Sequence, residues 1–189
     1  TVRNTSNFFN DRMTLDLGFS YVIQKDQNML SQGQYFNPIV PLYLFPRGED
    51  FTPYRMYERY DEGRQLMTQH WPYGEMGMAM QNPYWIINRN MFNNDRDRYM
   101  ANAGLKYKVF DWMDISGRVR IDNANTRHTK KLYASTDAKF AQSKGYYGDR
   151  KDVDKQLYAD FLVNINKRFN DFDLTANVGA SIQDVSMDY

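Results

Sequence analysis

The chain has no cysteine among its 189 residues, which excludes a disulfide framework and a thiolate metal site. It also lacks any run of 18 apolar residues, so the sequence predicts no transmembrane helix. The formal net charge is only +1, because 24 Lys and Arg residues nearly balance 23 Asp and Glu residues. This balance gives no electrostatic reason to expect a nucleic-acid partner. These absences leave a membrane location open, since strands that cross a membrane alternate in hydropathy and never form a long apolar run.

Signatures of catalysis are also scarce. The chain has only two histidines, His70 and His128, and they are far apart in sequence. No GxSxG, HExxH or P-loop motif occurs. Neighbouring carboxylates such as Glu49 and Asp50 are weak grounds for a glycosidase, because adjacent loop residues are not a spaced acid/base pair. We therefore expect no enzyme activity, no cofactor and no metal.

Strict period-two alternation is the strongest positive signal in the sequence. It is clearest at 155–184, which predicts two strands joined by a turn at 168–171, with one apolar and one polar face. The same alternation predicts strands at 13–25, 96–109 and 113–122, the last extending toward Lys131, and the end of a strand at 1–9. The residues on the apolar face of the 155–184 hairpin are Leu157, Ala159, Phe161, Val163, Ile165, Phe172, Leu174, Ala176, Val178, Ala180 and Ile182.

Short and long connections alternate between the predicted strands. Short turns at 10–12, 110–112 and 168–171 contain an aromatic residue beside Asn or Asp, whereas the connections at about 26–95 and 132–152 have no period. In an antiparallel meander, this alternation puts all short turns at one end and all long loops at the other. That is the layout of an outer-membrane barrel. A loop of roughly 70 residues is also uncommon in a compact soluble domain and indicates a function.

Two fold classes explain the alternation, a soluble β-sandwich and a membrane barrel. The predicted strands are longer than the globular average of about 5–6 residues and match the roughly 9–11 residues that a membrane strand needs. Their apolar faces carry no charge, and aromatic residues lie near the strand ends. We therefore expect an all-β antiparallel meander of about six strands from a transmembrane barrel. Because single-chain barrels have at least eight strands, the remaining strands are expected outside this sequence.

Several stretches of the first long connection resemble a known family. They are Tyr35-Phe36-Asn37-Pro38, Leu42-Tyr43-Leu44-Phe45-Pro46-Arg47-Gly48-Glu49-Asp50-Phe51, Trp71-Pro72-Tyr73-Gly74-Glu75-Met76-Gly77-Met78 and Gln81-Asn82-Pro83-Tyr84-Trp85-Ile86-Ile87-Asn88-Arg89. With these motifs, most of the chain resembles the SusC/RagA family of TonB-dependent transporters from the outer membrane of Bacteroidetes-type bacteria. The resemblance implies that residues 1–189 are an interior slice of a 22-stranded barrel, without the plug domain or the N-terminal part that contacts TonB.

The resemblance also implies a function. Family members import oligosaccharides, or peptides, with energy delivered through TonB and with a SusD-like surface lipoprotein as the lid. Candidate residues for contact with substrate or lid are Arg47, Glu49, Asp50, Trp71, Tyr73, Tyr84, Trp85 and Arg89. Aromatic and charged side chains suit a ligand pocket, but they also anchor protein interfaces or pack a loop onto itself, so all three roles stay open. The alternative function is a secreted, soluble carbohydrate-binding β-sandwich.

The polar face of the predicted strands carries charges that a barrel would turn toward its lumen. They are Asp114, Arg118, Arg120 and Asp122. We expect these side chains to pair with the plug or with neighbouring strands.

Overall fold

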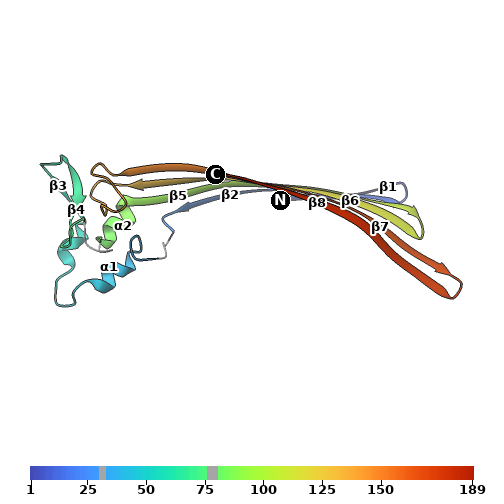
Figure 1. Ribbon diagram of the computed structural model, residues 1–189, viewed down its shortest axis with the longest axis horizontal. Helices are drawn as coiled ribbons and strands as arrows, with labels where there is room; N and C mark the ends of the chain where they lie inside the picture. The colour runs from blue at the N-terminus through green and yellow to red at the C-terminus, as the bar shows by residue number, and fades with distance from the viewer. Residues whose placement is uncertain (30–32, 76–80) are drawn as a thin grey trace. The chain divides into compact units, whose positions relative to one another are not determined.

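The structure is a computed structural model that describes residues 1–29, 33–75 and 81–189. Six strands form one antiparallel sheet in the order β1-β2-β5-β6-β7-β8 (Figure 1). Their bounds are Val2–Phe8 for β1, Met13–Gln27 for β2, Asn90–Phe110 for β5, Met113–Leu132 for β6, Tyr146–Phe169 for β7 and Phe172–Asp188 for β8. The predicted six-stranded antiparallel meander is confirmed. The sheet is open, with β1 and β8 as its edge strands, so these six strands do not close into a barrel.

The chain divides into two compact units. Unit 1 consists of Thr1–Gln24, Arg96–Thr126 and Lys151–Tyr189, and unit 2 consists of Lys25–Asp95 and Arg127–Arg150. Unit 2 therefore contains both long connections, which the sequence predicts as two separate loops. The two connections fold together as one body.

The hairpin of β7 and β8 has the predicted register. Phe161 pairs with Ala180 and Val163 pairs with Val178, so the apolar residues of both strands share one face of the sheet. Phe169 pairs with Phe172, and the turn therefore contains only Asn170 and Asp171 instead of the predicted 168–171. Asn170 has a φ of 47°, a left-handed conformation that Asn tolerates better than most residues.

The three short turns of unit 1 lie next to one another at the same end of the strands. The Lys108 N–H donates to the Arg12 carbonyl at 2.7 Å, and the Asn166 N–H donates to the Trp112 carbonyl at 2.8 Å. These bonds join the turn after β1 to β5, and the turn after β5 to β7. The predicted gathering of the short turns is confirmed.

Two strands begin earlier than the alternation of hydropathy predicts. β5 begins at Asn90 instead of Arg96, and β7 begins at Tyr146, inside the predicted 132–152 loop. β6 continues through its polar end to Leu132, as expected. The difference has a simple cause, since backbone pairing needs no apolar face. The period disappears where apolar and polar residues are mixed on both faces, although the ladder of hydrogen bonds continues.

The two faces of the sheet in unit 1 differ in chemistry. On one face the apolar side chains are uncovered; Val119 is 45% exposed and Val178 is 67% exposed. On the other face Arg118 pairs with Asp160 at 3.0 Å and Lys106 pairs with Asp114 at 3.4 Å, while Asp122 bonds to Arg98. The expected pairing with neighbouring strands is therefore confirmed for Asp114, Arg118 and Asp122. Arg120 forms no ion pair among the described residues.

Unit 2 holds the short elements of the fold. They are α1 (Ile39–Leu44), the 3-10 helix η1 (Thr52–Arg55), the hairpin of β3 (Glu58–Asp61) and β4 (Leu66–Gln69), and α2 (Pro83–Arg89). Within the described residues, no helix is long and apolar enough to cross a membrane. Nearly all fully buried apolar residues of the described chain belong to this unit: Trp71, Trp85, Ile86, Leu132 and Ala141. Met76, Gly77 and Met78 of the family-like motif lie outside the described residues.

Candidate functional site

The candidate site lies in unit 2, where the two long connections share a core that is unusually polar. Seven polar or charged residues of this unit are buried beside its few apolar ones: Gln69, Gln81, Asn82, Asn90, Ser135, Thr136 and Asp137. A buried polar group is costly unless it is hydrogen-bonded. The partners of these side chains therefore decide how the two connections are held.

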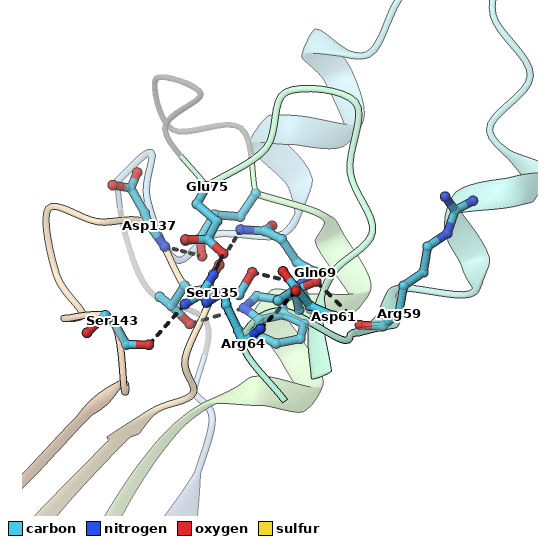
Figure 2. Close-up of polar contacts among 12 residues, drawn as sticks. Arg59, Asp61, Arg64, Gln69, Glu75, Ser135, Asp137 and Ser143 are labelled. Carbon is cyan, nitrogen blue, oxygen red and sulfur yellow. Dashed lines mark hydrogen bonds and ion pairs between the residues drawn. The ribbon is translucent and has the colours of Figure 1, made fainter. Parts of the chain in front are cut away.

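Gln69 and Ser135 form the central link between the connections (Figure 2). The Gln69 N–H donates to Ser135 Oγ at 2.9 Å, and Gln69 Nε2 donates to the Ser135 carbonyl at 2.6 Å. Nearby, Arg64 bonds to Glu75 through Nη1 and donates from Nη2 to the Ser143 carbonyl at 2.9 Å. The β3–β4 hairpin is thus fastened to the second connection at two points.

Asn82 organises the start of α2. Its Oδ1 accepts from the Tyr84 N–H at 2.9 Å, and its Nδ2 donates to the carbonyls of Tyr54 at 2.8 Å and His70 at 2.9 Å. The Asn82 side chain is an N-cap, and Pro83 follows at the first helical position, where a missing N–H does no harm. One side chain therefore starts the helix and fixes two distant backbone segments.

Gln81 extends the same hydrogen-bond network to the Tyr35 segment and to the second connection. Its Nε2 donates to the Tyr35 carbonyl at 3.1 Å, and its Oε1 accepts from the Asp137 N–H at 3.1 Å. Gln81 and Asn82 together connect the Tyr35 segment, the η1 region and the second connection. The family-like motif around Asn82-Pro83 is thus a structural centre of unit 2.

Trp85 is a core residue of unit 2. Its exposed fraction is 0%, and its Nε1 donates to Thr136 Oγ1 at 3.1 Å, while Thr136 Oγ1 donates to Asn90 Oδ1 at 2.7 Å. Because no part of Trp85 reaches the surface, its role here is to hold the two connections together. Among the predicted contact residues, it is the one with the clearest packing role.

An aromatic cluster contains three of the other predicted contact residues. Trp71, 6% exposed, packs its ring 5.5 Å from Phe45, 5.4 Å from Tyr54 and 5.8 Å from Tyr73, and Tyr84 lies 6.2 Å from Phe51. Trp71 Nε1 is buried and has no hydrogen-bond partner among the described residues. Tyr73 and Tyr84 are only half-buried, so they retain ring surface that a ligand or partner can contact.

The charged turn of Arg47, Glu49 and Asp50 is exposed and leads directly into this cluster through Phe51, whose ring lies 6.0 Å from Trp71. Asp50 Oδ1 accepts from the Thr52 N–H at 2.9 Å. This backbone hydrogen bond, with a second one from the Thr52 side chain, holds the pKa of Asp50 below its ordinary value. The structure therefore brings the charged turn and Trp71, Tyr73 and Tyr84 into one part of unit 2.

Arg89, the last predicted contact residue, is engaged inside the unit. Its Nε and Nη2 donate to the two carboxylate oxygens of Glu58 at 2.7 and 2.8 Å, and its guanidinium lies 4.9 Å from the Tyr133 ring centre. Partial burial lowers the Arg89 pKa, and the hydrogen bonds and charge of Glu58 more than offset this, so the net pKa is raised. A bidentate pair of this kind positions α2 against β3.

Sequence reasoning missed Lys130, near the end of β6, and Phe140 in the second connection as part of the site. The Lys130 ammonium lies between 5.4 and 5.9 Å from four ring centres, those of Phe36, Phe92, Phe140 and Tyr146. No local sequence pattern predicts these long-range contacts. The Asn-Pro pair at the start of α2, in contrast, is a readable helix-start signal.

The two histidines have different surroundings and do not contact the same residues. His70 Nδ1 lies 3.0 Å from the Met56 carbonyl and its ring lies 5.1 Å from Tyr54, whereas His128 Nδ1 lies 2.7 Å from Asn94 Oδ1. Among the described residues, no group of three His, Cys, Asp or Glu side chains is arranged to hold a metal ion.

Comparison of the chain with models of known protein families finds no match, and comparison with curated proteins finds none either.

Proposed function

We propose that this chain supplies six strands of a large, 22-stranded outer-membrane barrel of the SusC/RagA type. In this proposal the barrel imports oligosaccharides, or peptides, and takes its energy through TonB. Unit 2 is the extracellular part, which meets the substrate and a SusD-like surface lipoprotein.

The uncovered apolar face of unit 1 carries this proposal. Unit 1 consists only of sheet strands and short turns, and none of its described residues covers that face. On β7 the face runs from Leu157 to Ile165, which is roughly 27 Å along the strand at about 3.4 Å per residue. At a tilt of about 40° this is roughly 21 Å of membrane depth, close to the apolar band of about 25 Å in outer-membrane barrels.

The borders of the apolar face support the same proposal. At one border Tyr21 Oη donates to Asp97 Oδ1 at 3.1 Å, and Asn123 Nδ2 donates to Tyr99 Oη at 2.5 Å. Tyrosine with its ring in the apolar band and its hydroxyl bonded to a polar group is typical of a membrane interface.

The border at the short turns has aromatic residues and a cation. The Lys167 ammonium lies 4.5 Å from the Trp112 ring centre and 5.0 Å from that of Phe169, and Trp112 stacks on Phe110 at 5.1 Å. Aromatic rings and a lysine at this depth suit the headgroup region of a bilayer. Both ends of the apolar face thus have interfacial chemistry.

Barrel closure requires additional strands. β1 and β8 are open edges, and unpaired backbone groups are not tolerated in lipid. The proposal therefore includes further strands that pair with both edges.

Unit 2 offers surfaces for the proposed substrate and lid. Tyr73 and Tyr84 present ring surface beside the charged turn, and α1 exposes Leu42, Tyr43 and Leu44, with Tyr43 84% exposed. Exposed apolar and aromatic residues of this kind are common at protein interfaces. The soluble sandwich is less well supported, because the second sheet of the described residues, β3–β4, has strands of only four residues.

The test is extraction of the native protein from cell membranes in mild detergent, followed by mass spectrometry of the proteins that purify with it. A surface lipoprotein in stoichiometric amount supports the importer and its lid. Recovery in the aqueous fraction as a monomer without a partner contradicts the barrel and favours the carbohydrate-binding module. Repeating the extraction at high salt separates a true partner from proteins held only by surface charge.

A further inference from the structure

The polar face of unit 1 contains a hollow of about 430 Å³ that spans residues from β1 to β7. Its floor is open because Gly104 has no side chain. A Cβ at Gly104 would lie 3.5 Å from Arg118 Cγ and 3.9 Å from Asp16 Cβ, so a longer side chain would enter the hollow. On the neighbouring strand, the Asn102 amide occupies the space that a side chain at Gly18 would need. The hollow thus depends on Gly104, whereas the space beside Gly18 is filled by Asn102.

The hollow has donors that its own acceptors do not use, and Asp16 Oδ1 is a buried acceptor without a hydrogen-bond partner among the described residues. Arg118 donates only its Nε to the two oxygens of Asp160, at 3.1 and 3.0 Å, and its Nη1 and Nη2 have no hydrogen bond among the described residues. Arg120 forms no ion pair there, and Arg3 lies 3.8 Å from Asp16, beyond hydrogen-bond distance. Three arginines therefore face two aspartates in one hollow.

The fixed part of the hollow is Asp160, whose side chain is only 11% exposed, whereas that of Arg118 is 66% exposed. Asp160 orients Arg118 from below through Nε and leaves the outer edge of the guanidinium free. Such an edge matches the two oxygens of a carboxylate or sulfate group. Arg120 follows Arg118 by two residues on the same face of β6 and adds a second cation.

We propose that this hollow binds the carboxylate or sulfate group of an acidic oligosaccharide. Arg118 and Arg120 hold the oxyanion, and the ring of Tyr158, which lines the same hollow, contacts the adjoining sugar. Asn102 and Asp16 supply the mixed donors and acceptors that sugar hydroxyls need. The volume exceeds that of a bare ion and lies within the range of ligand pockets, about 300–1,000 Å³.

This inference rests on the proposed import function, because it takes the polar face as a wall that the cargo passes. It also narrows that function, since it names acidic glycans as the substrate class.

The test is calorimetric titration of the intact protein in detergent micelles at fixed low salt. The probes are tri-galacturonic acid, maltotriose, sodium sulfate and an aspartate tripeptide. The test variants are Arg120→Gln, which removes the second cation, and Gly104→Leu, which fills the floor. Lys108→Gln is the matched control, because it removes one positive charge from the same face outside this hollow.

We expect tri-galacturonic acid to bind, Arg120→Gln to weaken binding by roughly ten-fold, and Gly104→Leu to abolish it. Lys108→Gln should change the affinity by less than about two-fold. Equal binding of maltotriose would overturn the acidic class, and equal binding of sulfate alone would overturn the glycan. Equal binding of the aspartate tripeptide would replace the glycan with a peptide.

Membrane extraction of the same variants separates this inference from the proposed function. If the variants assemble in the membrane but no probe binds, only the hollow fails as a ligand site. If the protein is recovered from the aqueous fraction yet binds tri-galacturonic acid through Arg120, the import function fails and the site stands.

Discussion

Units 1 and 2 are held together in opposite ways. Unit 1 is a single layer whose apolar side chains stay uncovered, as Val178 illustrates, and its order comes from strand register and from ion pairs on the polar face. Unit 2 encloses Trp85 completely and satisfies its buried polar side chains with backbone groups from distant segments. Unit 2 therefore has its own core, whereas one apolar face of unit 1 is not covered by any residue of that unit.

The largest expected effect tests that need directly. Val119→Arg and Val178→Arg place a charge on the uncovered face, where a lipid environment makes it cost about 2–4 kcal/mol. We expect little mature protein in the outer-membrane fraction, measured by heat-dependent mobility on gels. Ser116→Arg and Thr175→Arg are the matched controls on the opposite face and should assemble. Equal tolerance at all four positions would remove the distinction between the faces.

The second prediction concerns the core of unit 2. Trp85→Ala removes a fully buried ring and leaves Thr136 without its indole donor, so we expect unit 2 to lose about 3–5 kcal/mol of stability. Native-state proteolysis should then cut within 33–75 and 133–145 much faster. Tyr43→Ala, at an 84% exposed position, is the control and should stay within about 0.5 kcal/mol of the parent. Equal sensitivity of both variants would mean that unit 2 has no core of its own.

The same comparison explains which parts of the fold the sequence predicts. Period-two alternation reports a backbone whose two faces meet different environments, so it locates the paired residues of β7 and β8 in unit 1. It fails at Asn90–Asp95 in β5, where the strand continues although Met91 and Phe92 lie on opposite faces and polar residues share both faces with them. It is silent on Gln69 and Ser135, because a side chain that bonds to a backbone 66 residues away leaves no local period.

Sequence predicts which residues gather in the candidate site, because residue type decides which side chains pack together. Trp71, Tyr73 and Tyr84 do gather with the charged turn before Phe51, since aromatic residues in a long connection tend to pack together. What sequence alone cannot assign is which ring is fully enclosed. Trp85 is enclosed and Tyr84 is half-exposed, although they are neighbours, because they point to different sides of the short helix α2.

A third prediction sharpens the contrast between an exposed helix cap and a buried one. Asn82→Ala removes the cap of α2 and leaves the Tyr54 and His70 carbonyls without a donor, so we expect a loss of about 2 kcal/mol or more. Asn82→Asp keeps the capping oxygen but cannot donate. At an exposed cap, Asp would restore stability; here it should not, and it should be as sensitive to protease as Ala. Full rescue by Asp would show that capping alone matters.

The smallest expected effect lies at the exposed edge of unit 2, at Asp50. Because the Thr52 N–H and side chain favour the charged carboxylate, the folded pKa is lowered, and the contribution of this bond to stability is present above the unfolded value of about 3.9. It is lost as the pH falls through the lowered folded pKa, which lies below that value. The Thr52 amide resonance should therefore shift only in this acidic range, and Asp50→Asn should abolish the shift while retaining an acceptor. Thr52→Ala, which keeps the backbone donor, should move the Asp50 pKa only partway back toward its ordinary value. If the shift occurs at the ordinary aspartate pKa in both the parent protein and Thr52→Ala, the turn does not hold the carboxylate, and the exposed edge of unit 2 lacks the fixed geometry of its core.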